Sequence, residues 1–290
     1  MLIVMSGGQV EQESSDVTFY GVRGSTPCNG RETARYGGNT SCVSLSIPGH
    51  DPILFDMGTG MRYFGLRQPC TPFCGHVLLS HLHWDHTQGL PFFTPILREG
   101  SQLDIYAPAQ SDTRTVGEVL AETIRPPLFP IPLAEFPGQM RFHDVDDSDF
   151  ELGGVSVMSR LIPHCGPTCG YRVSWNDRSV TYISDHQMPC DGSMGATDAA
   201  LELVQDTDLL IHDSQFTTEE FAMKSTWGHC TAEYAVWLAA EAGAKKLALF
   251  HHDPGRCDDA VDRLYDDARR LGDRRGVEVV AASEGLTLRV

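Results

Sequence analysis

Residues 75–89 (GHVLLSHLHWDHTQG) concentrate side chains that bind metal ions. An apolar run over 76–80 has the character of a buried strand. Four ligand-type side chains follow it within six residues: His81, His83, Asp85 and His86. Placing them beside a buried strand is costly unless a cation compensates, and imidazole and carboxylate groups are ligands of zinc and related ions. The alternative is a surface histidine cluster, which further ligand-type residues at later strand ends argue against.

The spacing within this run suggests two metal positions. If the strand direction persists, His81 and His83 point to the same side, because side chains alternate along a strand. A turn at Trp84 then brings Asp85 and His86 to a second position. Paired catalytic metals commonly lie about 3.5–4 Å apart.

Three further ligand-type residues, His164, Asp185 and His251, follow apolar runs later in the chain. Polar residues at the ends of several buried strands are typical of how layered α/β enzymes assemble a site. Together the seven side chains supply enough ligands for two divalent ions. We expect His81, His83 and His164 on one ion and Asp85, His86 and His251 on the other, with Asp185 bridging them.

The elements that must position these residues alternate between strands and helices. Hydrophobic periodicity predicts strands over 17–22, 42–47, 53–56, 76–80, 102–106, 155–160, 171–174, 180–184, 209–212, 246–251, 277–281 and 286–290. It predicts helices over 60–66, 115–123, 196–206, 218–225, 231–242 and 258–271. The chain therefore reads as an α/β protein with helix-covered sheets. Residues 125–138 contain five prolines and form neither a regular helix nor a central strand.

Composition restricts the class of protein. The 290 residues are 41% hydrophobic and 21% charged, which is typical of a folded chain. We expect residues 1–16 to form a flexible N-terminal tail and 17–290 a single hydrolase domain. No membrane segment or secretory signal is recognisable, and nine cysteines without a regular framework favour the cytoplasm. The net charge of −17 predicts a small anionic substrate, with no long nucleic acid and no membrane as a partner.

The HLHWDH segment resembles the HxHxDH signature of the metallo-β-lactamase fold, and the order of His164, Asp185 and His251 matches as well. The resemblance covers roughly residues 17–290 and favours the branch of ribonuclease Z and the phosphoribosyl cyclic phosphodiesterases. Residues 56–60 (DMGTG) look like its DxGxG turn, and 21–27 (GVRGSTP) and 36–41 (YGGNTS) look like its glycine-rich entry segments. The resemblance implies a four-layer αββα sandwich with two divalent metal ions. It favours Zn²⁺, and Mn²⁺ or Fe also suit these ligands. It also favours His251 over the adjacent His252 as a ligand.

The resemblance extends to catalytic residues. Residues 212–215 (HDSQ) stand where ribonuclease Z has a His-Glu-Ala-Thr stretch, and 228–231 (GHCT) stand where it has Gly-His-Ser-Thr. This implies that His229 is the general acid for the leaving oxygen and that Asp213 holds its ring. Asp85 would orient or deprotonate the hydroxide that two metal ions generate from water near pH 7.

These residues predict a phosphodiesterase that acts on a small or cyclic phosphodiester, such as a cyclic nucleotide or a cyclic sugar phosphate. Ribonuclease Z carries a long arm for tRNA between the ligands that match His164 and Asp185, and here only about 20 residues separate them. The alternatives are a lactonase or thioesterase type of carbonyl hydrolase, or a non-catalytic sensor that retains the fold. Relatives often dimerise, so a homodimer is possible.

Two features stay open at this stage. Cys70, Cys74, Cys165 and Cys169 form two pairs of similar spacing that could meet in a second, structural metal site, or could be incidental thiols. The proline-rich 125–138 loop could wall the substrate pocket, or could be a rigid contact without a substrate role.

Overall fold

The computed structural model describes residues 14–290 and contains two seven-stranded sheets. The first sheet has the spatial order β14 (Thr287–Arg289), β1 (Asp16–Gly21), β2 (Cys42–Ser46), β3 (Ile53–Phe55), β4 (Cys74–Leu78), β5 (Gln102–Pro108) and β6 (Gln139–Val145). The second has the order β13 (Glu278–Ala281), β12 (Lys246–Phe250), β11 (Leu209–Asp213), β10 (Arg178–Ile183), β9 (Cys169–Trp175), β8 (Val155–Leu161) and β7 (Ser148–Leu152).

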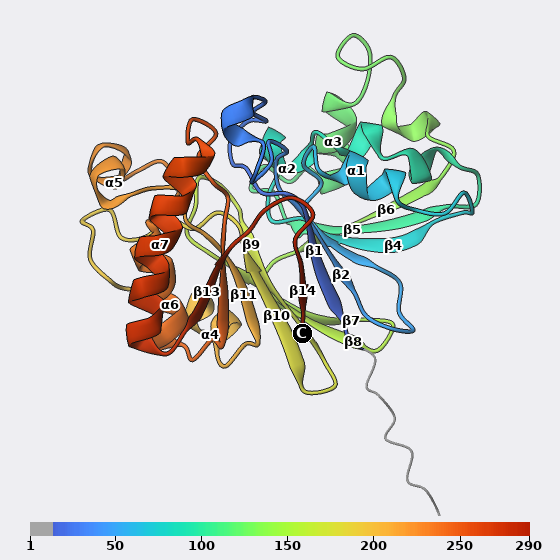
Figure 1. The fold of residues 1–290 in the computed structure, drawn as a ribbon. Coiled ribbons are helices and arrows are strands. Elements are labelled where there is room, and N and C mark those ends of the chain that lie inside the picture. The colour runs from blue at the N-terminus through green and yellow to red at the C-terminus, as the bar shows by residue number, and fades with distance from the viewer. Residues whose placement is uncertain (1–13) are drawn as a thin grey trace, which may run out of the picture.

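Helices cover the outer face of each sheet (Figure 1). The first sheet is covered by α1 (Met61–Leu66) and α3 (Val116–Thr123), while the short α2 (Trp84–Thr87) follows β4. The second sheet is covered by α4 (Asp198–Val204), α5 (Thr218–Lys224), α6 (Ala232–Glu241) and α7 (Asp258–Arg275). This arrangement confirms the predicted four-layer αββα sandwich.

Alternation along the strands explains why the layers form. In β3, Ile53 and Phe55 enter the core between the two sheets, while Leu54 packs under the helices of the first sheet. In β11, Leu210 likewise faces the helices, while its neighbours Leu209 and Ile211 face the opposite sheet. Because such strands are apolar on both faces, they read in the sequence as continuous hydrophobic runs.

Parallel pairing brings the ends of the site-bearing strands to one edge. Strands β3 to β6 are parallel in the first sheet, and β10 to β13 are parallel in the second. The carboxyl ends of parallel strands lie on the same side of a sheet, and in open α/β sheets this is where ligands bind. The segments after β4, β10, β11 and β12 therefore meet where the two sheets face one another.

Two strands and one α-helix were absent from the sequence prediction. Strands β6 and β7 each lie at the edge of a sheet and are half exposed, so their polar residues hide the hydrophobic pattern. The four-residue helix α2 occupies the position where a turn at Trp84 was predicted. The predicted tail lies mainly outside the described residues, although β1 already begins at Asp16.

Helix α7 is long and amphipathic. It carries six aspartates and five arginines, and its apolar side, which includes Val261 and Leu264, is buried. Among residues 14–290, no helix combines the length and the apolar character that crossing a membrane requires.

Arg23 ties the glycine-rich entry segment to the β12–α7 connection. Its side chain is fully buried and donates hydrogen bonds to the carbonyl oxygens of Gly37 (2.8 Å), Asp253 (3.2 Å) and Arg256 (2.8 Å). Its Nη2 atom lies 3.5 Å from Oδ1 of Asp258 at the start of α7. The guanidinium of Arg23 therefore joins the segment of Gly37, the β12–α7 connection and the start of α7.

We predict that Arg23→Ala lowers the free energy of unfolding by about 3–5 kcal/mol, because it leaves buried carbonyl groups and the Asp258 carboxylate without their partner. Denaturant unfolding measures this loss. Arg67→Ala is the matched control, since Arg67 is exposed and should change stability by less than about 0.5 kcal/mol. A loss below about 1 kcal/mol for Arg23→Ala would contradict the role of this contact.

Candidate metal centre

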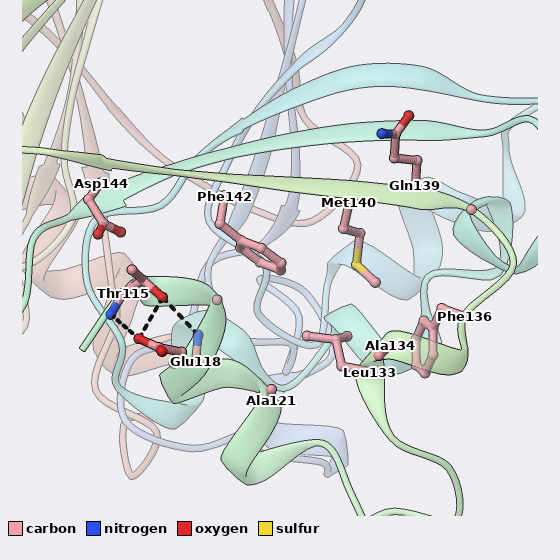
Figure 2. Close-up of a pocket in the computed structure, with 12 residues that line it drawn as sticks. Thr115, Glu118, Ala121, Leu133, Ala134, Phe136, Gln139, Met140, Phe142 and Asp144 are labelled. Atoms are coloured by element: carbon pink, nitrogen blue, oxygen red, sulfur yellow. Dashed lines mark hydrogen bonds between the residues drawn. The ribbon is translucent and has the colours of Figure 1, made fainter.

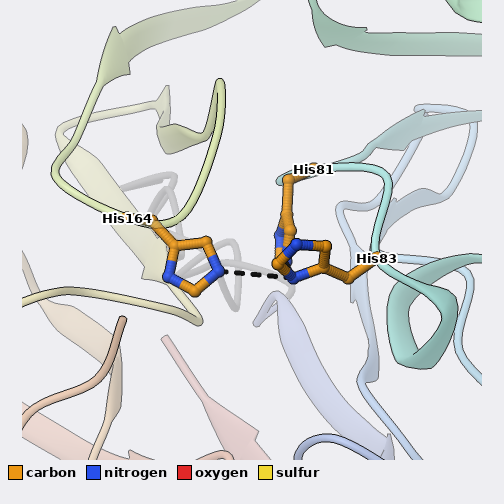
Figure 3. Close-up of side chains that lie close together, drawn as sticks. All are labelled: His81, His83 and His164. Atoms are coloured by element: carbon orange, nitrogen blue, oxygen red, sulfur yellow. Dashed lines mark hydrogen bonds between the residues drawn. The ribbon is translucent and has the colours of Figure 1, made fainter. Parts of the chain in front are cut away.

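Three histidines from distant parts of the chain converge at the edge between the sheets (Figure 3). Nε2 of His81 lies 2.8 Å from Nδ1 of His83, and Nε2 of His164 lies 3.4 Å from the same Nδ1 atom. His81 and His83 follow β4, whereas His164 lies in the β8–β9 connection. The His83 residue is exposed, so this half of the site opens to solvent.

A second group, Asp85, His86 and His251, is buried beside the first. Oδ2 of Asp85 lies 3.1 Å from Nε2 of His86 and 3.2 Å from Nε2 of His251. The backbone N–H of Ser25 donates to the same Oδ2 atom at 2.7 Å. This half is therefore held by β12, α2 and the glycine-rich entry segment.

Asp185 lies between the two groups. Its Oδ2 atom is 3.9 Å from Nε2 of His81 and 3.6 Å from Nε2 of His164. Its Oδ1 atom is 3.2 Å from Nε2 of His86 and 3.3 Å from Nε2 of His251. One carboxylate oxygen thus faces each histidine group, which is the geometry that a bridging ligand needs.

Hydrogen bonds behind the histidines fix which ring nitrogen faces the centre. Nδ1 of His164 is 2.7 Å from the carbonyl oxygen of Gly228, and Nδ1 of His251 is 3.0 Å from Oε1 of Gln215. Nδ1 of His86 is 2.6 Å from a carboxylate oxygen of Asp56. These oxygens only accept, so each Nδ1 must donate, and in the neutral ring this leaves the Nε2 lone pair free for a metal ion.

Asp56 is a positioning residue whose role the sequence did not reveal. Its Oδ1 atom accepts from the backbone N–H of Ser80 at 2.7 Å, and its Oδ2 atom accepts from the hydroxyl groups of Ser80 (3.0 Å) and Tyr182 (2.6 Å). Asp56 was recognised only as the first residue of a glycine-rich turn. Its contact with His86 joins residues 30 positions apart, and no local spacing rule reports such a contact.

The glycines of the entry segment and of the α5–α6 connection make room for the ligand rings. A Cβ atom on Gly24 would lie 2.4 Å from the ring of His251, and one on Gly228 would lie 2.5 Å from the ring of His164. Gly228 also has a φ of 91°, which favours glycine. These motifs therefore serve close packing around the site.

The residues of this cluster fit a bound cation. Nε2 of His86 and Oδ1 of Asp185 are buried without a hydrogen-bond partner in the described part of the chain. Burial lowers the pKa of His86, but the charges of Asp85, Asp185 and Asp56 raise it well above its ordinary value. Burial raises the pKa of Asp85, yet the charges and hydrogen bonds of His86 and His251 bring it well below its usual range. The pocket thus favours positive charge, which metal ions would supply.

Two histidines that adjoin candidate ligands in the chain point away from the cluster. Nε2 of His252 donates to the carbonyl oxygen of Ala282 at 2.9 Å, so the ring points away. Nδ1 of His186 pairs with Nε2 of His212 at 2.9 Å, and the His186 ring packs beside Tyr234. Across residues 14–290, none of the groups positioned to hold a metal includes a cysteine, so the four spaced thiols do not form a second site.

His229 and Asp213 form a pair next to the cluster. Nδ1 of His229 lies 2.9 Å from Oδ2 of Asp213, which also accepts from the backbone N–H of His186 at 3.1 Å. Nδ1 of His229 is 3.8 Å from Oδ2 of Asp185. Burial lowers the pKa of His229, but the nearby carboxylates outweigh it and raise the pKa to about 9. The contact with Asp213 therefore favours the protonated form of the ring.

The proline-rich loop borders a cavity away from the metal centre (Figure 2). This cavity of about 670 Å³ lies between α3, β6 and residues 133–138, and none of the seven candidate ligands lines it. Leu133 and Phe136 contribute to its apolar wall. Closer to the site, the loop contacts Phe92 through Phe129, with ring centroids 6.0 Å apart.

Comparisons with known proteins support the same type of fold and centre. Residues 52–252 match the family described as the beta-lactamase superfamily domain. Ribonuclease Z of Haloarcula marismortui is 27% identical, with 94% of this chain and 96% of that protein covered. The structure resembles the metallo-beta-lactamase fold protein YhfI from Bacillus subtilis (TM-score 0.72, 19% identity, 96% and 99% covered) and the short form of human tRNase Z (TM-score 0.63, 22% identity, 94% and 98% covered).

These relatives correct one sequence-based expectation. A small anionic substrate was predicted to the exclusion of long nucleic acid, and that prediction is wrong, because relatives over nearly the whole chain are named ribonucleases. Net charge describes the whole surface, whereas a site responds to its local field.

We predict that Gly228→Ala weakens binding of one metal equivalent by about 10- to 100-fold, because the new methyl group displaces the ring of His164. Competition with a chromophoric chelator measures the affinity. Gly192→Ala is the matched control, since Gly192 has a similar positive φ of 79° and open space around it. Equal effects of the two substitutions would show that backbone strain, and not His164, determines the result.

Proposed function

Because the chain belongs to the beta-lactamase superfamily domain family and is thus a hydrolase of the metallo-β-lactamase fold, we propose that it is a dinuclear metal-dependent phosphodiesterase. The observation that carries the proposal is the Asp185 carboxylate, whose two oxygens face two separate groups of ligand-type side chains. This arrangement supports one ion on His81, His83 and His164, and another on Asp85, His86 and His251.

Zinc is the metal that we propose. Five imidazoles and two carboxylates suit Zn²⁺, and Mn²⁺ or Fe are the alternatives that the same donors accept. When bound, two such ions supply a water activated near neutral pH and neutralise charge that develops on a phosphoryl oxygen. We assign Asp85 to hold or accept the proton of that water, since its carboxylate is fixed by the Ser25 backbone at the centre.

His229 supplies the proton for the leaving oxygen. Its Nδ1 atom is bound to Asp213, so the proton that it can release is the one on Nε2. Asp213 is held in turn by the backbone N–H groups of His186 (3.1 Å) and Gln215 (2.9 Å). The pair therefore keeps one ring orientation and one protonated nitrogen available, as general acid catalysis requires.

The proposal covers small and polymeric phosphodiesters. The interval between His164 and Asp185 is filled by the hairpin of β9 and β10, with Asn176 and Asp177 at its turn. A compact cyclic diester, such as a cyclic nucleotide or cyclic sugar phosphate, is one substrate to test. RNA is the other, since ribonuclease Z is the name of the relative that spans most of the chain.

We place this hydrolase in the cytoplasm as a single domain. All nine cysteines are free, and five of them are buried or partly buried. Thiols that are not paired in disulfides are typical of a reducing compartment.

We predict that His229→Ala lowers kcat about 10²- to 10⁴-fold on a dinucleotide, whose alkoxide leaving group needs a proton, and much less on bis-p-nitrophenyl phosphate, whose leaving group does not. Metal content should stay unchanged. The control is His143→Ala, which removes a histidine paired with Asp104 at 2.8 Å outside the cluster. Equal losses on both substrates would contradict the acid role. Turnover of lactones or thioesters without any diester hydrolysis would contradict the phosphodiesterase itself.

A further inference from the structure

A second cavity, of about 450 Å³, is lined in part by Gln88 and Gly89, which directly follow the α2 segment that carries Asp85 and His86. The mechanism above does not use it. Its lining comes from α1, from the end of α2 and from the segments next to them: Asn39, Thr59, Arg62, Tyr63, Gln88, Gly89 and Phe92. Cavities of this size suit a small organic group, and this one combines aromatic faces with amide, hydroxyl and guanidinium groups.

The cavity is joined directly to the segment that carries two candidate ligands. Gln88 and Gly89 follow His86 closely in the chain, and the backbone N–H of Gln88 donates to the carbonyl oxygen of Trp84 at 2.9 Å. The backbone N–H of Met57 donates to the carbonyl oxygen of His86, and Gly89 donates back to Met57, both at 2.8 Å. Gln88 and Gly89 therefore lie two and three residues after His86 in a segment fixed by backbone hydrogen bonds.

The aromatic residues of the cavity are exposed although they are large and apolar. Tyr63 is 44% exposed and Phe92 is 55% exposed. Phe92 also contacts Phe129 of the proline-rich loop, which gives that loop a place at the rim. Exposed rings that gather beside a catalytic centre offer stacking faces to a planar group.

Arg62 adds an available positive charge. Its guanidinium carbon lies 5.2 Å from the centroid of the Tyr63 ring. Within the described chain, no carboxylate lies within salt-bridge distance of Arg62, whereas Arg35, Arg114, Arg141 and Arg160 all have acidic partners. In a protein of net charge −17, an arginine without an acidic partner beside a catalytic centre is suited to an anion.

We propose that this cavity is a subsite for one nucleotide unit of the substrate, with the base stacked on Tyr63 or Phe92 and a non-scissile phosphate paired with Arg62. The subsite rests on the proposed function, because its nucleotide is the part of a phosphodiester that flanks the bond cleaved at the metals. It makes nucleotide diesters, rather than diesters in general, the preferred substrate class.

Two chromogenic esters with the same leaving group test the preference. Arg62→Ala and Tyr63→Ala should each lower kcat/KM about tenfold for thymidine 3′-phosphate 5′-(p-nitrophenyl phosphate), whose 3′-phosphate is the non-scissile group. The loss should arise chiefly through KM, since stacking and cation contacts act on binding. The same variants should change kcat/KM for bis-p-nitrophenyl phosphate less than about twofold. Tyr63→Phe, which keeps the ring, should retain the preference.

Matched controls come from the other end of the same helix. Arg67 is also an exposed arginine over a tyrosine ring, 5.1 Å from the centroid of Tyr20, but it does not line the cavity. Leu66 is 58% exposed and is also absent from the lining. Arg67→Ala and Leu66→Ala should leave both substrates unchanged. If they match the effect of Arg62→Ala and Tyr63→Ala, or if those variants affect both esters equally, the subsite is overturned.

Calorimetry with adenosine 5′-monophosphate separates the subsite from the proposed reaction, because it needs no turnover. We expect the Kd to rise about tenfold in Arg62→Ala and Tyr63→Ala and to stay constant in Arg67→Ala. Such a result in a protein that hydrolyses no phosphodiester would support the subsite and contradict the proposed function. Absence of binding, or binding indifferent to these variants, would overturn the subsite.

Discussion

The carboxylate of Asp185 faces five imidazoles from two directions while it is almost completely buried. A buried charge of this kind is stable only when positive charge lies next to it. The neighbouring rings supply that charge only if they take up protons, and most of them are themselves buried. Divalent cations between Asp185 and the rings would neutralise the carboxylate and accept the lone pairs of the rings. The rest of the site serves to hold these cations.

The fold meets this need by bringing strand ends together. Parallel pairing in each sheet places the segments after β4, β10 and β12 at one edge, and packing of the two sheets brings these edges face to face. Close backbone approach then orients the rings, as at Gly24 against His251 and at Gly228 against His164. The buried guanidinium of Arg23 holds the entry segment in place behind them. Stability and site geometry therefore depend on the same contacts.

Sequence patterns predicted the residue types of the site better than their surroundings. Ligand-type side chains at the ends of apolar runs identified the seven residues that the structure brings together, because strand alternation and strand ends are local signals. The contacts of Asp56 with His86 and of Gln215 with His251 join residues far apart in the chain, so only the folded structure reveals them. The edge strands β6 and β7 were missed because half-exposed strands lack a continuous apolar run.

The wrong exclusion of long nucleic acid has a similar origin. Net charge is a sum over the whole chain and does not say where the charges lie. On α7, for example, five arginines nearly balance six aspartates. Beside the metal centre, the local groups are different in kind: exposed aromatic rings and an arginine without an acidic partner. Placement in the fold, which composition does not report, decides what the surface around the centre can bind.

Anomalous diffraction from crystals grown with zinc tests the central claim most directly. Two zinc peaks about 3.5–4 Å apart are expected, one against His81, His83 and His164 and the other against Asp85, His86 and His251, with an oxygen of Asp185 on each. A single peak, or zinc bound without Asp185 between two positions, would contradict the dinuclear account.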